Sequence, residues 1–109
     1  VLVHVEAPDE AGHAGSWDIK RKAVELIDLH VVGPVLDALQ KFDKWRILVM
    51  PDHATPIATR SHSGEPVPFA MAGTGISGML HEPFSEANAA RTGFVIEHGH
   101  ELIEYFIKH

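Results

Sequence analysis

The sequence predicts an α/β domain with a mostly parallel sheet. Two short runs rich in apolar and β-branched residues, at 1–6 and 44–50, flank a stretch at 17–42 whose apolar residues recur every three or four positions. A strand, a helix and a second strand in this order form a βαβ unit, whose strands are parallel and whose crossover is right-handed. A length of 109 residues leaves room for one domain, at 1–109, with one core.

The first strand and the turn after it are predicted by composition. The run VLVHVE at 1–6 stops at Ala7-Pro8, and a short apolar run bounded by proline is typical of a buried strand. Residues 8–16 contain two glycines and a proline, and these residues favour a turn. We therefore expect a strand and then a loop before any helix begins.

A long helix is predicted over 17–42, because its apolar residues lie on one face. That face comprises Ile19, Ala23, Leu26, Ile27, Val31, Val35, Leu39 and Phe42. Ser16 or Asp18 can cap its first turn. Gly33-Pro34 is expected to kink or restart the helix, because proline suits a first turn and disrupts a helix interior.

Further elements are predicted after this helix. A buried strand at 44–50 is followed by a weaker strand at 66–71, whose two prolines favour an edge position. A loop over 73–83 leads to a short helix near 86–91, which Ser85 can cap. These assignments give a sheet of three strands.

The last predicted element is an amphipathic helix over 100–108. Its inward residues are expected to be Leu102, Ile103, Phe106 and Ile107. Three strands make a thin sheet for a free-standing α/β domain, so we expect the chain to be a partial domain whose sheet edge is covered by further chain. The uncovered edge and this helix would also favour self-association into a homo-oligomer.

Composition and charge exclude several classes of protein. The chain is 45% hydrophobic and 22% charged, which is typical of a globular protein. Nine Lys and Arg against 15 Asp and Glu give a net charge of −6, which argues against non-specific nucleic-acid binding. No apolar run approaches the ~20 residues of a membrane span. The absence of cysteine excludes disulfides and thiolate metal sites and fits a cytoplasmic protein.

Acidic and imidazole side chains follow both predicted strands of the βαβ unit. Asp9 and His13 come after the first strand, Asp52 and His53 directly after the second, and His62 on the loop beyond. Ligands of open parallel sheets bind at the carboxyl ends of the strands, so we expect the two pairs to converge. Carboxylate and imidazole together suit Zn²⁺, Mn²⁺ and related divalent ions. The pattern therefore predicts a metal centre.

Five such ligands are more than one tetrahedral ion with an open position takes. They are too few for two ions, which usually share six to eight ligands and lie about 4 Å apart. Taken alone, the spacing of Asp9 and His13 is also explained by chance or loop capping. Asp52-His53 is also explained by a turn in which a side chain bonds its own backbone, and His62 by a surface histidine. The hypothesis of a metal centre therefore depends on both pairs following the two predicted strands.

Other chemically active residues are expected to be structural or solvated. Six histidines lie outside the two pairs and the following loop: His4, His30, His81, His98, His100 and His109. The glycine-rich GTGISG at 73–78 lacks the Lys-Ser/Thr ending of a phosphate-binding loop, so we expect an ordinary loop. No serine lies in a strand-to-helix elbow, which leaves the chain without a predicted nucleophile.

Four segments resemble a known family. HVEAPDEAGHAG (4–15), VVGPVLDAL (31–39), ILVMPDHATPI (47–57) and RSHSGEPVPFAM (60–71) are similar to the C-terminal part of the archaeal-type, cofactor-independent phosphoglycerate mutases, which belong to the alkaline phosphatase superfamily. The resemblance covers essentially the whole chain. It implies a three-layer α/β/α sandwich, present here as a partial domain.

The resemblance also implies a function and a set of ligands. Two divalent ions, Mn²⁺ or Zn²⁺ with Co²⁺ or Mg²⁺ as further candidates, would be held by Asp9, His13 and His62 and by Asp52 and His53. The family interconverts 3- and 2-phosphoglycerate in glycolysis and gluconeogenesis through a phosphoserine intermediate. The nucleophilic serine and a further aspartate have no counterpart here, so no catalytic residue is expected and the chain alone should be inactive.

Two alternatives stay open at the level of sequence. Proposed homoserine kinases and other phosphoryl-transfer enzymes or hydrolases of the same superfamily share these metal motifs, and their distinguishing substrate contacts lie elsewhere. The chain is also compatible with a non-catalytic metal-binding or self-associating module. The expected partner of the mutase is a small phosphorylated substrate, and neither nucleic acid nor membrane.

Overall fold

The structure, a computed structural model, describes residues 1–108. It consists of two compact units, and each is described by itself. The first unit combines Val1–Lys41 with His53–Pro66, and the second combines Phe42–Asp52 with the chain from Val67 onward. Four of the five predicted ligands lie in the first unit, namely Asp9, His13, His53 and His62, while Asp52 belongs to the second.

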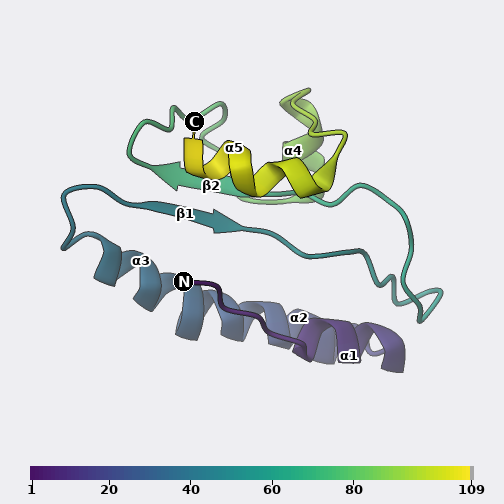
Figure 1. Cartoon of the computed structure of the whole chain (residues 1–109). Coiled ribbons are helices and arrows are strands. Elements are labelled where there is room, and N and C mark those ends of the chain that lie inside the picture. Colours follow the sequence, from purple (N-terminus) through teal and green to yellow (C-terminus); the bar gives the residue numbers. More distant parts are fainter. Residues whose placement is uncertain (109) are drawn as a thin grey trace. The chain divides into compact units, whose positions relative to one another are not determined.

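Helix α1 (Ala7–Ala14) begins the first unit (Figure 1). Pro8 occupies the first turn of the helix, where backbone N–H groups have no partner within the helix, so the missing N–H of proline costs no hydrogen bond. Asp9 lies in the same turn, near the positive end of the helix dipole. Gly15 ends the helix in the left-handed conformation at φ 71°, which glycine adopts without strain. Because of these three features, the segment predicted to be a turn is a helix.

The predicted strand over 1–6 is wrong. These residues form no regular secondary structure, and all six are exposed. A strand needs a neighbour for its backbone groups, and none of the described residues pairs with this run. Apolar, β-branched composition therefore did not suffice to make a strand here.

The predicted long helix is present in three pieces. Helix α2 (Trp17–Ile27) packs against α1, a π-helical segment η1 (Asp28–Val32) follows, and α3 (Gly33–Leu39) completes the run. Ser16 caps α2 as predicted, with the Ile19 N–H donating to its Oγ at 3.4 Å. The predicted restart at Gly33-Pro34 is confirmed, because proline lies in the first turn of α3 directly after the π segment.

The second unit contains the sheet. Strand β1 (Arg46–Val49) pairs antiparallel with β2 (Ala70–Gly73), as Figure 1 shows. Strand β1 lies within the strand predicted at 44–50, and β2 overlaps the strand predicted at 66–71 at Ala70 and Met71. The predicted parallel βαβ pair is wrong for residues 1–108, because its first strand is not formed and the sheet there has two antiparallel strands. The α/β class is retained, while the described residues do not by themselves form a three-layer sandwich.

Three helical segments complete the second unit. Helix α4 (Glu86–Arg91) is capped by Ser85 as predicted, with the Asn88 N–H donating to its Oγ at 3.1 Å. The short 3₁₀ segment η2 (Gly99–Glu101) leads into α5 (Leu102–Lys108). The Arg46 guanidinium donates to the Phe106 carbonyl at 2.7 Å and so ties α5 to β1.

The buried core is small. Ala11 and Leu102 are the buried apolar residues among those described, and Thr55 is the buried polar one. The predicted inward face of the last helix is confirmed at Leu102 and wrong at Ile103 and Ile107, which are 56% and 69% exposed. None of the described helices is long and apolar enough to cross a membrane.

Candidate metal centre

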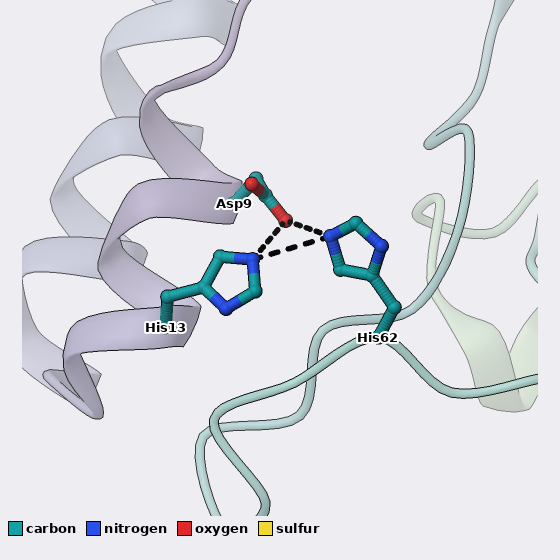
Figure 2. A group of neighbouring side chains, drawn as sticks. All are labelled: Asp9, His13 and His62. Atoms are coloured by element: carbon teal, nitrogen blue, oxygen red, sulfur yellow. Dashed lines mark hydrogen bonds and ion pairs between the residues drawn. The ribbon is translucent and has the colours of Figure 1, made fainter.

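Three of the five predicted ligands meet in the first unit (Figure 2). Asp9 Oδ1 lies 3.1 Å from His62 Nε2 and 3.3 Å from His13 Nε2, and the two imidazole nitrogens are 3.2 Å apart. One oxygen and two nitrogens therefore surround a single point. All three residues are at least partly exposed to solvent.

Helix α1 supplies two of the three donors. Asp9 and His13 are four residues apart, and residues at this spacing lie on the same face of a helix. The sequence predicted that both residues follow a strand in a turn, whereas the structure places them on a helix. The helix holds their separation more firmly than a loop would.

His62 reaches the same point from the loop between His53 and Pro66. The Ser63 N–H donates to the Ala54 carbonyl at 3.0 Å, which folds this loop back on itself. Between those residues, Arg60 adopts the left-handed conformation at φ 54°, which is uncommon for a residue with a side chain. The resulting turn brings His62 opposite α1.

The turn also orients His13. The Arg60 carbonyl lies 2.9 Å from His13 Nδ1, and a carbonyl only accepts hydrogen bonds. His13 Nδ1 therefore carries the proton, and the Nε2 of the neutral ring directs a lone pair toward the point that it shares with the Asp9 and His62 donor atoms. A metal-binding histidine is normally held in this manner through its other nitrogen.

Thr55 connects the cluster to His53. Its hydroxyl donates to Asp9 Oδ1 at 2.8 Å and lies 3.2 Å from His53 Nδ1. The His53 ring stacks on His62 with 3.6 Å between ring centroids and 33° between planes. His53 is thus the immediate neighbour of the three-residue cluster, whereas Asp52 is an exposed residue of the second unit.

The Asp9 carboxyl has a lowered pKa. The hydrogen bond from Thr55 is the largest cause, because it stabilises the ionised form. Desolvation acts in the opposite direction, and the charges of His13 and His62 lower the pKa further. Asp9 is therefore ionised at neutral pH and available as an anionic ligand.

Sequence reasoning did not identify three of the residues that build this site. They are Thr55, the Arg60 carbonyl, and Lys20, whose ammonium donates to the Thr55 carbonyl at 2.6 Å. Thr55 lies two residues after His53, within the PDHATP segment that resembles the mutase family, so this segment could have pointed to Thr55. The roles of Lys20 and of the Arg60 backbone depend on tertiary contacts that no spacing reveals.

The remaining histidines lie outside the cluster. His30, His81, His98 and His100 are exposed, as expected, while His4 is exposed on the irregular segment rather than within a strand. His109 lies outside the described residues. The glycine-rich segment after β2 forms a turn and loop, as predicted.

Comparison with known proteins identifies the family. A family model described as the metalloenzyme superfamily matches residues 1–105. The chain belongs to the metalloenzyme superfamily. Membership implies use of a divalent metal ion, which agrees with the Asp9, His13 and His62 cluster.

Several curated relatives are named as phosphoglycerate mutases. The chain is 44% identical over 108 residues to the 2,3-bisphosphoglycerate-independent phosphoglycerate mutase of Methanothrix thermoacetophila, covering 98% of this chain and 28% of the relative. It is 41% identical over 113 residues to the probable mutase of Geobacter sulfurreducens, covering 98% and 27%. The mutase of Methanosarcina barkeri is 44% identical over 110 residues, covering 99% and 28%.

These matches confirm the resemblance to the mutases that the sequence motifs indicated. The chain spans little more than a quarter of the length of these curated relatives. No solved structure matches it significantly.

Proposed function

We propose that this chain is the metal-binding segment of a 2,3-bisphosphoglycerate-independent phosphoglycerate mutase. Asp9, His13 and His62 would hold one divalent cation, Mn²⁺ or Zn²⁺. The single observation that carries the proposal is the convergence of Asp9 Oδ1 and the two Nε2 atoms within 3.3 Å of one another. The names of the relatives support the choice of reaction.

The donor atoms fit a cation in spacing and in kind. Two donors bound about 2.1 Å from one ion at a tetrahedral angle are separated by about 3.4 Å. The three separations here, 3.1, 3.2 and 3.3 Å, are close to that value. One carboxylate and two imidazoles are also a donor set that suits Zn²⁺ and Mn²⁺.

Hydrogen bonding alone also explains such distances, so the protons must be placed. His13 Nε2 carries a lone pair because its Nδ1 donates to Arg60. Without a cation, a proton on His62 Nε2 would lie between that lone pair and Asp9. A divalent cation would take the place of this proton, which in the neutral His62 ring would then lie on Nδ1.

A second cation position is proposed beside the first. His53 stacks on His62, and by the family resemblance His53 and Asp52 would be its ligands from this chain. The rest of both coordination shells, together with the nucleophilic serine and the three-layer sandwich, would come from polypeptide beyond this segment. No serine of this chain is proposed as the nucleophile.

The proposed reaction is two successive phosphoryl transfers. The serine hydroxyl takes the phosphoryl group from 3-phosphoglycerate, the glycerate turns, and its 2-hydroxyl takes the group back. When bound, the divalent ions would supply activation of the hydroxyl and neutralisation of charge on the transferred oxygens. The part of this chain would be to hold Asp9 ionised and to present imidazole lone pairs in fixed directions.

A chimera tests this function. The 109 residues would replace the matching segment of the Methanothrix thermoacetophila relative, which is 44% identical over 108 residues. We expect the chimera, supplied with Mn²⁺, to interconvert 3- and 2-phosphoglycerate. The Asp9→Asn variant of the chimera should lose most of this activity, while the Glu10→Gln variant retains it.

The controls separate the competing functions. The 109-residue chain alone should show no mutase activity, since it contributes no nucleophile. A folded chimera that leaves phosphoglycerate unchanged but phosphorylates homoserine from ATP would overturn the proposal in favour of a kinase. A folded chimera that catalyses neither reaction would leave only a metal-binding module and would equally contradict it.

A further inference from the structure

We propose that Thr55 is a positioning residue whose single hydroxyl fixes Asp9 and His53 together and so couples the two proposed cation positions. The inference rests on the proposed metal-binding function. Nothing in the spacing of the ligands requires such a residue, and Thr55 itself is not proposed to touch a cation.

Thr55 is more deeply buried than any proposed ligand. It is 5% exposed and is the buried polar residue of the described chain. Its carbonyl accepts from the Lys20 ammonium at 2.6 Å. A Cβ added at Gly12 would lie 2.6 Å from the Thr55 carbonyl and 2.9 Å from its Cγ2, so α1 and Thr55 are in close contact.

The direction of each hydrogen bond at Thr55 follows from its chemistry. The ionised Asp9 carboxylate only accepts, so the one hydroxyl proton of Thr55 lies on the 2.8 Å bond to Asp9 Oδ1. The hydroxyl oxygen then accepts from His53 Nδ1, 3.2 Å away, and the Ala54 carbonyl lies 3.4 Å from the same nitrogen. His53 Nδ1 therefore carries a proton, and Nε2 of the neutral ring carries the lone pair.

This arrangement repeats for His53 what the Arg60 carbonyl does for His13. In both rings the Nδ1 proton is held by an acceptor, and Nε2 becomes the nitrogen that can bind a metal. Thr55 differs in that the same oxygen also directs Asp9. Loss of the hydroxyl would release a ligand of each proposed cation at once.

Two substitutions separate this role from simple packing. Thr55→Val keeps both branches of the side chain and its volume but has no hydroxyl. Thr55→Ser keeps the hydroxyl but removes Cγ2, the atom next to Gly12. If Thr55 positions the ligands, Thr55→Val should weaken metal binding and Thr55→Ser should preserve it. If Thr55 only fills space, the order should be reversed.

Isothermal titration of the protein with Mn²⁺ and with Zn²⁺ provides the measurement. We expect Thr55→Val to weaken binding about 10- to 100-fold, as loss of an outer partner of a metal ligand does. Thr55→Ser should bind within a few-fold of wild type. The reverse order, or equal affinity of wild type and Thr55→Val, would overturn the inference while leaving the proposed metal function in place.

A second readout needs no metal. Long-range ¹H–¹⁵N spectra of the metal-free protein report which ring nitrogen of each histidine is protonated. We expect the Nδ1–H tautomer at His53 in wild type and in Thr55→Ser. The Nε2–H tautomer at His53 in wild type would contradict the role of Thr55, whereas failure of wild type to bind any metal would contradict the proposed function instead.

Discussion

Asp9 and His62 are 53 residues apart in sequence, yet their donor atoms lie 3.1 Å apart in the candidate site. The sequence predicted which residue types would gather there, because acid and imidazole recur at Asp9, His13 and His62. It did not predict how they are oriented. Thr55 orients Asp9, and the Arg60 carbonyl orients His13, across separations of 46 and 47 residues. Contacts between residues so far apart leave no periodic pattern in the sequence.

The lowered pKa of Asp9 predicts a specific pH dependence of stability. Because its pKa is lower in the folded than in the unfolded chain, the ionised carboxylate stabilises the fold above about pH 4, and this contribution is lost as the pH falls through the folded value. Urea denaturation of metal-free protein from pH 6 downward should show a steeper loss of unfolding free energy in wild type than in Asp9→Asn.

Thr55→Val provides the matched control, since the Thr55 hydrogen bond is the largest cause of the lowered pKa. Its acid sensitivity should lie between those of wild type and Asp9→Asn. Identical acid profiles for wild type and Asp9→Asn would contradict the ionised, hydrogen-bonded state of Asp9.

At the scale of elements, capping and breaking signals were more informative than apolar composition. Ser16 and Ser85 cap the helices for which they were predicted to do so, because an N-cap bond is local to one turn. The strand at 1–6 failed because pairing depends on a distant partner. Helix α1 was missed because Gly12, which suggested a turn, serves instead as the contact point for Thr55.

The close contact at Gly12 predicts the effect of adding one methyl group. Gly12→Ala would place Cβ 2.6 Å from the Thr55 carbonyl, and overpacking of this kind costs roughly 1–3 kcal/mol. Alanine favours a helix over glycine by only about 1 kcal/mol, so the free energy of unfolding should fall. Urea denaturation measures this change.

Gly64→Ala is the control within the same unit, because a Cβ there meets nothing within 4 Å. Its stability should stay within about 0.5 kcal/mol of wild type or rise slightly. A Gly12→Ala protein as stable as Gly64→Ala would show that α1 does not press on Thr55 as described.

At the scale of the whole molecule, the chain leaves much apolar surface uncovered. Trp17, Ile19 and Val24 on α2 are 67%, 63% and 54% exposed, and exposed apolar groups of this kind mark surfaces that pack against something else. In the proposed mutase, the rest of the polypeptide would cover them. The motifs in the sequence were sufficient to predict the family. They were not sufficient to predict the antiparallel pairing of the sheet, because the first strand of the expected parallel pair is not formed by the described residues.

The most direct test of the central claim is calorimetric titration of the protein with Mn²⁺. We predict saturable binding by the wild-type protein. Loss of an outer partner of a metal ligand costs ~10- to 100-fold in affinity, and Asp9→Asn and His62→Gln should each cost more, since each removes a ligand itself. Glu10→Gln, the next carboxylate on α1, should bind as wild type does. Binding that survives both ligand substitutions, or no binding by the wild-type protein, would contradict the metal centre.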